Sequence, residues 1–168
     1  MQEIHKLKSV IFAVAIGALL GAPAVAQQSA KSGTFSGKWG GQSTGQAYEL
    51  DKGHVFFLGA YNPVFFNDTP GGFLDRTAWT CALVSDSVNG VHVADHGYCI
   101  ATDKDGDKAF AVFQSKGTAP GSGAGTGQFT GGTGKFSGLQ GRYPFRFTLI
   151  GNTPASWVVT EGGERRVP

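Results

Sequence analysis

The most conspicuous candidate metal ligands in this sequence are three aspartates in alternation. Asp103, Asp105 and Asp107 fall within five residues, and carboxylate oxygens are the ligands that Ca²⁺ prefers. An EF-hand loop beginning at Asp103 would need glycine at its sixth position and glutamate at its twelfth. Lys108 and Gln114 stand there instead. The Asp-Gly pair also favours a hairpin turn, so the three aspartates are weak metal candidates and a solvated turn is the leading interpretation.

The histidines offer little for metal binding or catalysis. On an extended strand, His92 and His96 share one face but lie roughly 13 Å apart, too far for a shared metal without a bend, and His54 is remote in sequence. No glycine-rich nucleotide motif and no G-x-S-x-G segment occurs in the sequence, so neither phosphate binding nor a serine nucleophile is indicated. We therefore expect no cofactor.

Cys81 and Cys99 are the only cysteines of the chain. Between them, Asn89-Gly90 is typical of a type I′ hairpin turn, in which both central residues need positive φ. A hairpin centred there pairs residues whose numbers sum to about 179 or 180, which places the two sulfurs opposite each other. We expect a structural disulfide worth about 3 kcal/mol, with free or metal-binding thiols as the alternative.

The sequence is rich in aromatic residues, with 13 phenylalanines among them. Packing alone is the simpler explanation, and an apolar cavity inside a barrel, suited to a small hydrophobic ligand, is the alternative. The residues that we expect to line such a cavity are Phe56, Tyr61, Phe110, Phe145 and Phe147.

Short apolar runs separated by turn residues predict a chain made of strands. The 27 glycines are interleaved with aromatic and β-branched residues, as in chains with many tight turns. About eight strands and no helix are expected. The predicted strands lie at 34–39, 46–50, 54–61, 77–84, 98–102, 109–114, from Phe129, at 142–150 and at 156–160.

Two glycine-rich segments are interpreted differently. Residues 117–127 are expected to form a long mobile loop. Gly131–Gly141 is predicted to be a structural turn between strands, in which Phe136 points inward while Lys135 and Ser137 point to solvent.

The N-terminus has the features of a cleavable signal peptide. Lys6 and Lys8 precede an uncharged apolar run, and Ala24-Val25-Ala26 supplies the small-x-small cleavage pattern before Gln27. We therefore expect a bacterial periplasmic or secreted protein without a membrane span after cleavage. The predicted organisation is a signal peptide at 1–26, a flexible lead at 27–33 and one barrel domain at 34–168.

The charge of the chain excludes some partners. The formal net charge is only +2, which provides no electrostatic basis for binding nucleic acid or an anionic membrane. The length after cleavage, 142 of 168 residues, is typical of one domain. Small antiparallel sheets of this size form sandwiches or closed barrels. The predicted class is therefore all-β, a single antiparallel barrel.

One segment carries a resemblance to a known family. The run Thr130-Gly131-Gly132-Thr133-Gly134-Lys135-Phe136-Ser137-Gly138-Leu139-Gln140-Gly141 resembles the TGG[ST]G-x-F-x-G-x-x-G segment of allene oxide cyclases, of which dirigent proteins carry a shorter version. The mature chain also looks like a group of small exported bacterial proteins of unassigned function, on the basis of Gly97-Tyr98-Cys99, Asp103–Lys108 and the region from Trp157 to Glu164. The resemblance implies an eight-stranded antiparallel β-barrel with an internal cavity.

The same resemblance implies candidate catalytic positions. Tyr48-Glu49-Leu50 is similar to the cyclase segment that bears a cavity glutamate, and Cys81 falls where cyclases have a cavity cysteine. The Asn and Ser-Pro that hold a catalytic water in the cyclases have no counterpart beside Glu49.

Two functions from different classes follow. The leading hypothesis is a non-catalytic exported barrel that binds a small apolar ligand or acts as an envelope or surface interaction module. The alternative is a cyclase or isomerase that works in the cavity with Glu49. A large cavity reaching Glu49 would favour the enzyme, whereas a barrel filled by phenylalanines would favour the module. The sequence defines no oligomeric state.

Overall fold

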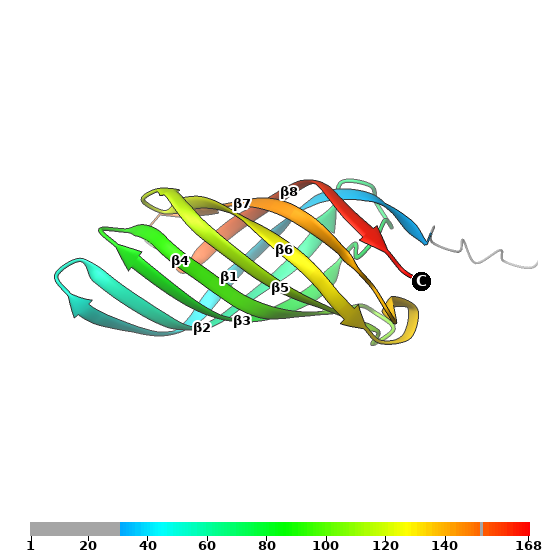
Figure 1. Cartoon of the computed structure of the whole chain (residues 1–168), viewed down its shortest axis with the longest axis horizontal. Helices are drawn as coiled ribbons and strands as arrows, with labels where there is room; N and C mark the ends of the chain where they lie inside the picture. The colour runs from blue at the N-terminus through cyan, green and yellow to red at the C-terminus, as the bar shows by residue number, and fades with distance from the viewer. Residues whose placement is uncertain (1–30, 152) are drawn as a thin grey trace, which may run out of the picture.

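A computed structural model describes residues 31–151 and 153–168 of the chain. The predicted signal peptide and residues 27–30 of the predicted lead lie outside the described residues. Eight strands and one short 3₁₀ helix make up the fold (Figure 1). The elements are β1 (Ser32–Asp51), β2 (His54–Asn67), β3 (Thr77–Val88), β4 (Val91–Thr102), β5 (Lys108–Ala119), β6 (Ser122–Gly132), η1 (Gly134–Phe136), β7 (Gly141–Leu149) and β8 (Ala155–Arg166).

The strands form a closed antiparallel barrel in chain order, with β1 pairing β8 to complete the wall. The predicted all-β barrel of about eight strands is therefore confirmed. Closure removes the exposed edges of an open sheet. β1 is one strand of 20 residues that begins at Ser32, whereas the sequence predicted two shorter strands beginning at Thr34.

The barrel has two distinct ends (Figure 1). Two-residue turns connect β1 to β2, β3 to β4 and β5 to β6 at one end, where β7 also connects to β8; we call it the hairpin end. The β2–β3, β4–β5 and β6–β7 connections lie at the other end, together with the start of β1 and the end of β8. We call it the loop end.

The β3–β4 hairpin follows the predicted register. Asn89 and Gly90 have φ values of 51° and 77°, as a type I′ turn requires. Cys81 faces Cys99 across the two strands and forms a disulfide with it. The predicted pairing is confirmed, and both cysteines are buried.

The prediction of a mobile loop at 117–127 is wrong, because most of this segment is strand. Only a tight turn at residues 120–121 separates β5 from β6. Gly123, Gly125 and Gly127 face Phe147, Phe145 and Tyr143 in the β6–β7 ladder, in that order. A β-carbon at any of the three glycines would collide with the ring opposite it. Glycine is used here so that aromatic rings can lie against a neighbouring strand.

Interlocking aromatic rings fill the part of the barrel interior that lies towards the loop end. Trp39 contacts Phe65, with ring centroids 4.5 Å apart, and meets Trp79 edge to face at 5.5 Å. The connections at the loop end add further buried side chains to this core, namely Leu74, Phe136 and Leu139, with Phe73 packed against them.

The Gly131–Gly141 connection is a turn that contains η1. Phe136 is buried there, as predicted. Lys135 and Ser137 are exposed, as predicted, and the Lys135 ammonium group also pairs with Asp103 and lies 2.9 Å from Asp105.

In the described part of the chain, no helix is long and apolar enough to cross a membrane.

Candidate ligand site in the barrel interior

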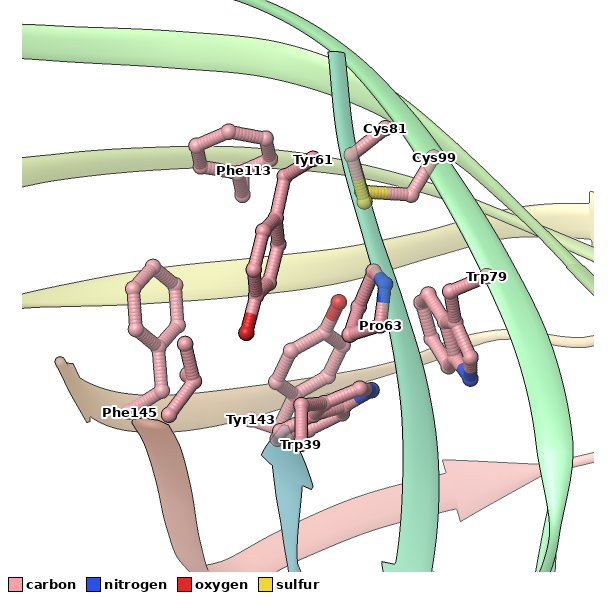
Figure 2. A pocket seen from close by; sticks show the side chains of 10 residues that line it. Trp39, Tyr61, Pro63, Trp79, Cys81, Cys99, Phe113, Tyr143 and Phe145 are labelled. Atoms are coloured by element: carbon pink, nitrogen blue, oxygen red, sulfur yellow. A yellow bond between two sulfur atoms is a disulfide. The ribbon is translucent and has the colours of Figure 1, made fainter. Parts of the chain in front are cut away.

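A small cavity lies in the middle of the barrel, where side chains from most strands converge. Its volume is about 70 Å³. Its lining is almost entirely apolar and includes the disulfide (Figure 2). The lining residues are Trp39, Tyr61, Pro63, Trp79, Cys81, Cys99, Phe113, Tyr143, Phe145 and Val158.

Strand alternation explains why these side chains meet. Tyr61, Pro63 and Phe65 are two residues apart on β2 and face inward, whereas the intervening Val64 is exposed. The same period of two brings Tyr143 and Phe145 inward from β7. Phe113 lies on β5 opposite Gly97, where a β-carbon would collide with its ring.

The lining includes two tyrosine hydroxyls, and Figure 2 shows both directed towards the space between the rings. The Tyr61 O–H donates to the Ser156 carbonyl oxygen at 3.2 Å. Burial raises the pKa of Tyr61, and the hydrogen bond to Ser156 only partly offsets this. Burial also holds the pKa of Tyr143 above its usual range. Both hydroxyls are therefore protonated at neutral pH, and neither is a base there.

The cavity is small compared with known ligand sites. Pockets for drug-sized ligands measure roughly 300–1,000 Å³, and a cavity of about 150 Å³ accommodates benzene. At about 70 Å³, this cavity has room for a few waters or a ligand of gas-molecule size. A cyclase or isomerase substrate of metabolite size does not fit without displacement of aromatic side chains.

The five predicted cavity residues divide between the two faces of the wall. Tyr61 and Phe145 line the cavity, and Phe147 points inward at the hairpin end, where its ring meets His92 at 5.1 Å. Side chains alternate between the two faces of a strand. Ala109 and Ala111 are fully buried, so Phe110 between them lies on the outer face.

Phe56 also lies on the outer face of the wall. It shares the face of Leu58 and Val64 on β2, which are exposed. Neither Phe56 nor Phe110 is among the residues that line the cavity.

Glu49, the candidate catalytic residue, does not reach the cavity. It lies near the end of β1 opposite Val55, in the part of the β1–β2 hairpin where the residues from Gln46 to Lys52 are exposed. It is not among the cavity-lining residues.

The sequence analysis missed a buried polar cluster at the hairpin end of the interior. His92 Nδ1 lies 2.9 Å from Asp95 Oδ1 and 3.0 Å from Ser85 Oγ. The Ser115 hydroxyl donates to Asp95 Oδ2 at 3.0 Å. Because serine and aspartate both approach the same imidazole nitrogen, this is not the Ser–His–Asp arrangement of a nucleophilic triad.

A register shift explains why sequence spacing misplaced His92. Asp86 pairs with Ala94, but Ser87 pairs with His92. The extra residue, Val93, is a bulge that turns His92 into the barrel. His96 remains exposed on the outer wall, so the two histidines do not share a face as predicted.

The three aspartates of the β4–β5 turn are held by protein groups. Asp103 Oδ1 accepts hydrogen bonds from the backbone N–H groups of Asp105 and Asp107, at 2.9 and 3.0 Å. Asp107 Oδ2 accepts one from the backbone N–H of Lys135 at 3.1 Å. Among the described residues, no group of three or more histidines, cysteines or acidic residues is arranged to hold a metal ion.

Comparison with known proteins adds no relative. No protein-family model, no curated protein and no solved structure matches the chain. Its class is thus defined by its architecture, a closed eight-stranded barrel with an internal disulfide.

Proposed function

We propose that this protein is an exported, periplasmic or secreted, non-catalytic barrel that binds its ligand or partner on its outside. The observation that carries this proposal is the filled interior. Aromatic rings from β1, β2, β3 and β7 interlock there and leave a cavity of only about 70 Å³. A small apolar ligand therefore has more room at the surface than inside the barrel.

The disulfide supports the proposed export, because disulfides persist in oxidising compartments such as the bacterial periplasm. The predicted cleavage before Gln27 belongs to the same proposal. N-terminal sequencing of the exported protein tests it, and an intact Met1 would contradict it.

The alternative, a cavity enzyme of the cyclase or isomerase type, fits the interior less well. Glu49 is exposed and does not line the cavity. Carboxylates that act as general acids or bases are usually tuned by burial or by a charged neighbour. The kinship with allene oxide cyclases or dirigent proteins remains a hypothesis that rests on the segment Thr130–Gly141.

The test compares the wild-type protein with two variants. Val158→Ile adds one methylene to the cavity lining, and Glu49→Gln removes the candidate catalytic charge. Proteins purified from their natural compartment are extracted, and small molecules released on denaturation are identified by mass spectrometry. We expect the same bound molecule in all three. Loss of the bound molecule in Val158→Ile would place the ligand inside the barrel. Chemical conversion of an added ligand by the wild type but not by Glu49→Gln would establish the enzyme.

A further inference from the structure

An open hollow of about 730 Å³ lies on the outside of the barrel wall, over β4, β5, β6 and β7. These four strands lie side by side on one face of the barrel (Figure 1). The volume falls within the range of pockets that bind small organic molecules, and it is about tenfold that of the interior cavity. The lining residues are His96, Gly97, Tyr98, Val112, Phe113, Gln114, Thr126, Gln128 and Arg142.

The register of the four strands arranges the outward side chains of the hollow in two rows that cross the wall. The first row is Tyr98, Val112, Gln128 and Arg142, which pair in turn across neighbouring strands. The second row is His96, Gln114 and Thr126. Members of the two rows are two residues apart on each strand, a separation of roughly 7 Å. The hollow is therefore a trough between the rows, with Gly97 and Phe113 at its floor.

The polar side chains of the trough are not engaged by the protein itself. In the described part of the chain, the side chains of Gln114, Gln128 and Arg142 have no hydrogen-bond or ion-pair partner, and neither has the Tyr98 hydroxyl. In the free protein these groups bind water, so a ligand at this place must supply hydrogen bonds in exchange.

The types of these side chains favour a neutral ligand rich in hydroxyl groups. Each glutamine amide offers donors and an acceptor, and the guanidinium offers five N–H donors. A sugar hydroxyl both donates and accepts, so it pairs with either kind of group. The lining contains no carboxylate and only one permanently charged residue, Arg142, which gives little basis for selecting a small anion.

A short apolar strip lies beside the polar groups. Tyr98 and Val112 are neighbours across β4 and β5, and both are exposed on the outer wall. A tyrosine ring supplies a flat apolar surface with a polar group at its end. A pyranose ring has the matching division, with C–H groups on its faces and hydroxyl groups around its rim. The trough crosses four strands, a span of about 14 Å, so it accommodates more than one sugar ring.

We propose that this trough binds a neutral oligosaccharide, with the Tyr98 ring as the platform for one sugar and with Gln114, Gln128 and Arg142 as partners of the hydroxyl groups. This inference rests on the proposed non-catalytic binding on the outside of the barrel, and it gives that interaction module a place and a partner class. Neither the interior cavity nor the loop end takes part in it.

Two neutral trisaccharides, cellotriose and tri-N-acetylchitotriose, provide the test on the mature exported protein. They share their linkage and differ in their acetamido groups, so together they present hydroxyl and amide partners to the glutamines. We expect calorimetric titration to give a dissociation constant below about 1 mM for at least one of them. Because both are uncharged, the affinity should not fall as salt is added.

Two variants remove groups of the trough, and each has a matched control elsewhere on the outside of the barrel. We expect Tyr98→Ala and Gln128→Ala each to lower the affinity at least about fivefold, because an apolar platform or a hydrogen bond is lost. Tyr48→Ala and Gln42→Ala on β1 should leave it unchanged. Tyr48 is 47% exposed, against 45% for Tyr98, and neither control residue lines the trough. Thermal unfolding verifies folding, and if one trough variant is unfolded, the other decides.

Failure of both trisaccharides to bind at millimolar concentration would overturn this inference, as would binding that neither trough variant weakens. Binding confined to the acidic trisaccharide trigalacturonate, and lost with added salt, would also overturn it, because Arg142 would then select an anion. The proposed binding function is judged separately, by the molecule that co-purifies with the protein. A co-purified molecule together with trisaccharides that do not bind would reject only this inference.

Discussion

The barrel interior is filled by different kinds of side chain at its two ends, although the same eight strands form both. Towards the loop end, Phe65, Phe129 and Leu139 are at most 2% exposed and form a continuous apolar core. At the hairpin end, the buried groups include Ser85, Asp95 and Ser115. The first arrangement gains free energy from removal of apolar surface from water. The second is stable only while each polar group keeps its hydrogen-bond partner.

This difference indicates which end can change without loss of the fold. Removal of a ring at the loop end leaves a cavity, whereas removal of a polar group at the hairpin end leaves an unpaired partner. The four predictions below test this comparison, from the largest expected effect to the smallest.

Removal of the Phe65 ring should have the largest effect. Phe65 is fully buried and packs on Trp39, so we expect Phe65→Ala to lower the free energy of unfolding by about 3–5 kcal/mol. The adjacent Phe66 is 44% exposed on the outer wall, and Phe66→Ala should cost less than about 1 kcal/mol. Urea unfolding measures both. Similar losses would show that the loop-end interior is not the main source of stability.

Removal of the disulfide should have the second-largest effect on stability. The link spans a sequence separation of 18 residues, and the chain-entropy account gives about 3 kcal/mol for its loss in a Cys81→Ala and Cys99→Ala double variant. Intact-mass analysis after alkylation is the direct check. Two alkylatable thiols without reductant would contradict the pairing.

The third prediction compares two His–Asp pairs on opposite faces of the wall. Asp95 is 8% exposed and accepts from Ser115 and His92. Asp95→Ala should cost about 1–3 kcal/mol, because the Ser115 hydroxyl loses this partner and His92 keeps only Ser85. Asp86, 2.7 Å from His54, is 38% exposed, and Asp86→Ala should cost less than about 1 kcal/mol. Thermal unfolding of the two variants at neutral pH decides. An equal cost would mean that the interior cluster is as accessible to water as the outer pair.

The smallest effect concerns the ion pairs at the outside of the loop end. Desolvation alone would raise the pKa of Asp103, but the hydrogen bonds from Lys135 and from two backbone N–H groups outweigh it and lower the pKa. The stabilisation is therefore present above the unfolded-state pKa, about 3.9, and is lost as the pH falls through the lower folded-state value.

Lys135→Met should reduce stability by less than about 1 kcal/mol at pH 7. Its melting temperature should approach that of the wild type as the pH is lowered towards 2. If the difference in melting temperature between variant and wild type stayed constant over this pH range, the ion pair would contribute nothing to stability, and the effect would come from the hydrocarbon part of the lysine side chain.

Local signals in the sequence determined the type of fold and one covalent contact. Strand periodicity and turn residues predict an all-β chain, and the Asn89-Gly90 turn defines the register that joins Cys81 to Cys99. Phe136 could be assigned to the interior from its glycine-rich surroundings. These features depend on residues close together in the chain, so sequence patterns suffice for them.

The tertiary structure alone decided the features that depend on distant partners. Residues 117–127 become strand because rings from β7 lie over the glycines of β6, and one bulged residue between β3 and β4 turns His92 into the barrel. The exposed Lys135 meets its carboxylate partners, Asp103 and Asp105, only because η1 lies against the β4–β5 turn. Burial of a side chain in a closed barrel depends on register around the whole wall, and a single shift reverses which face a residue occupies.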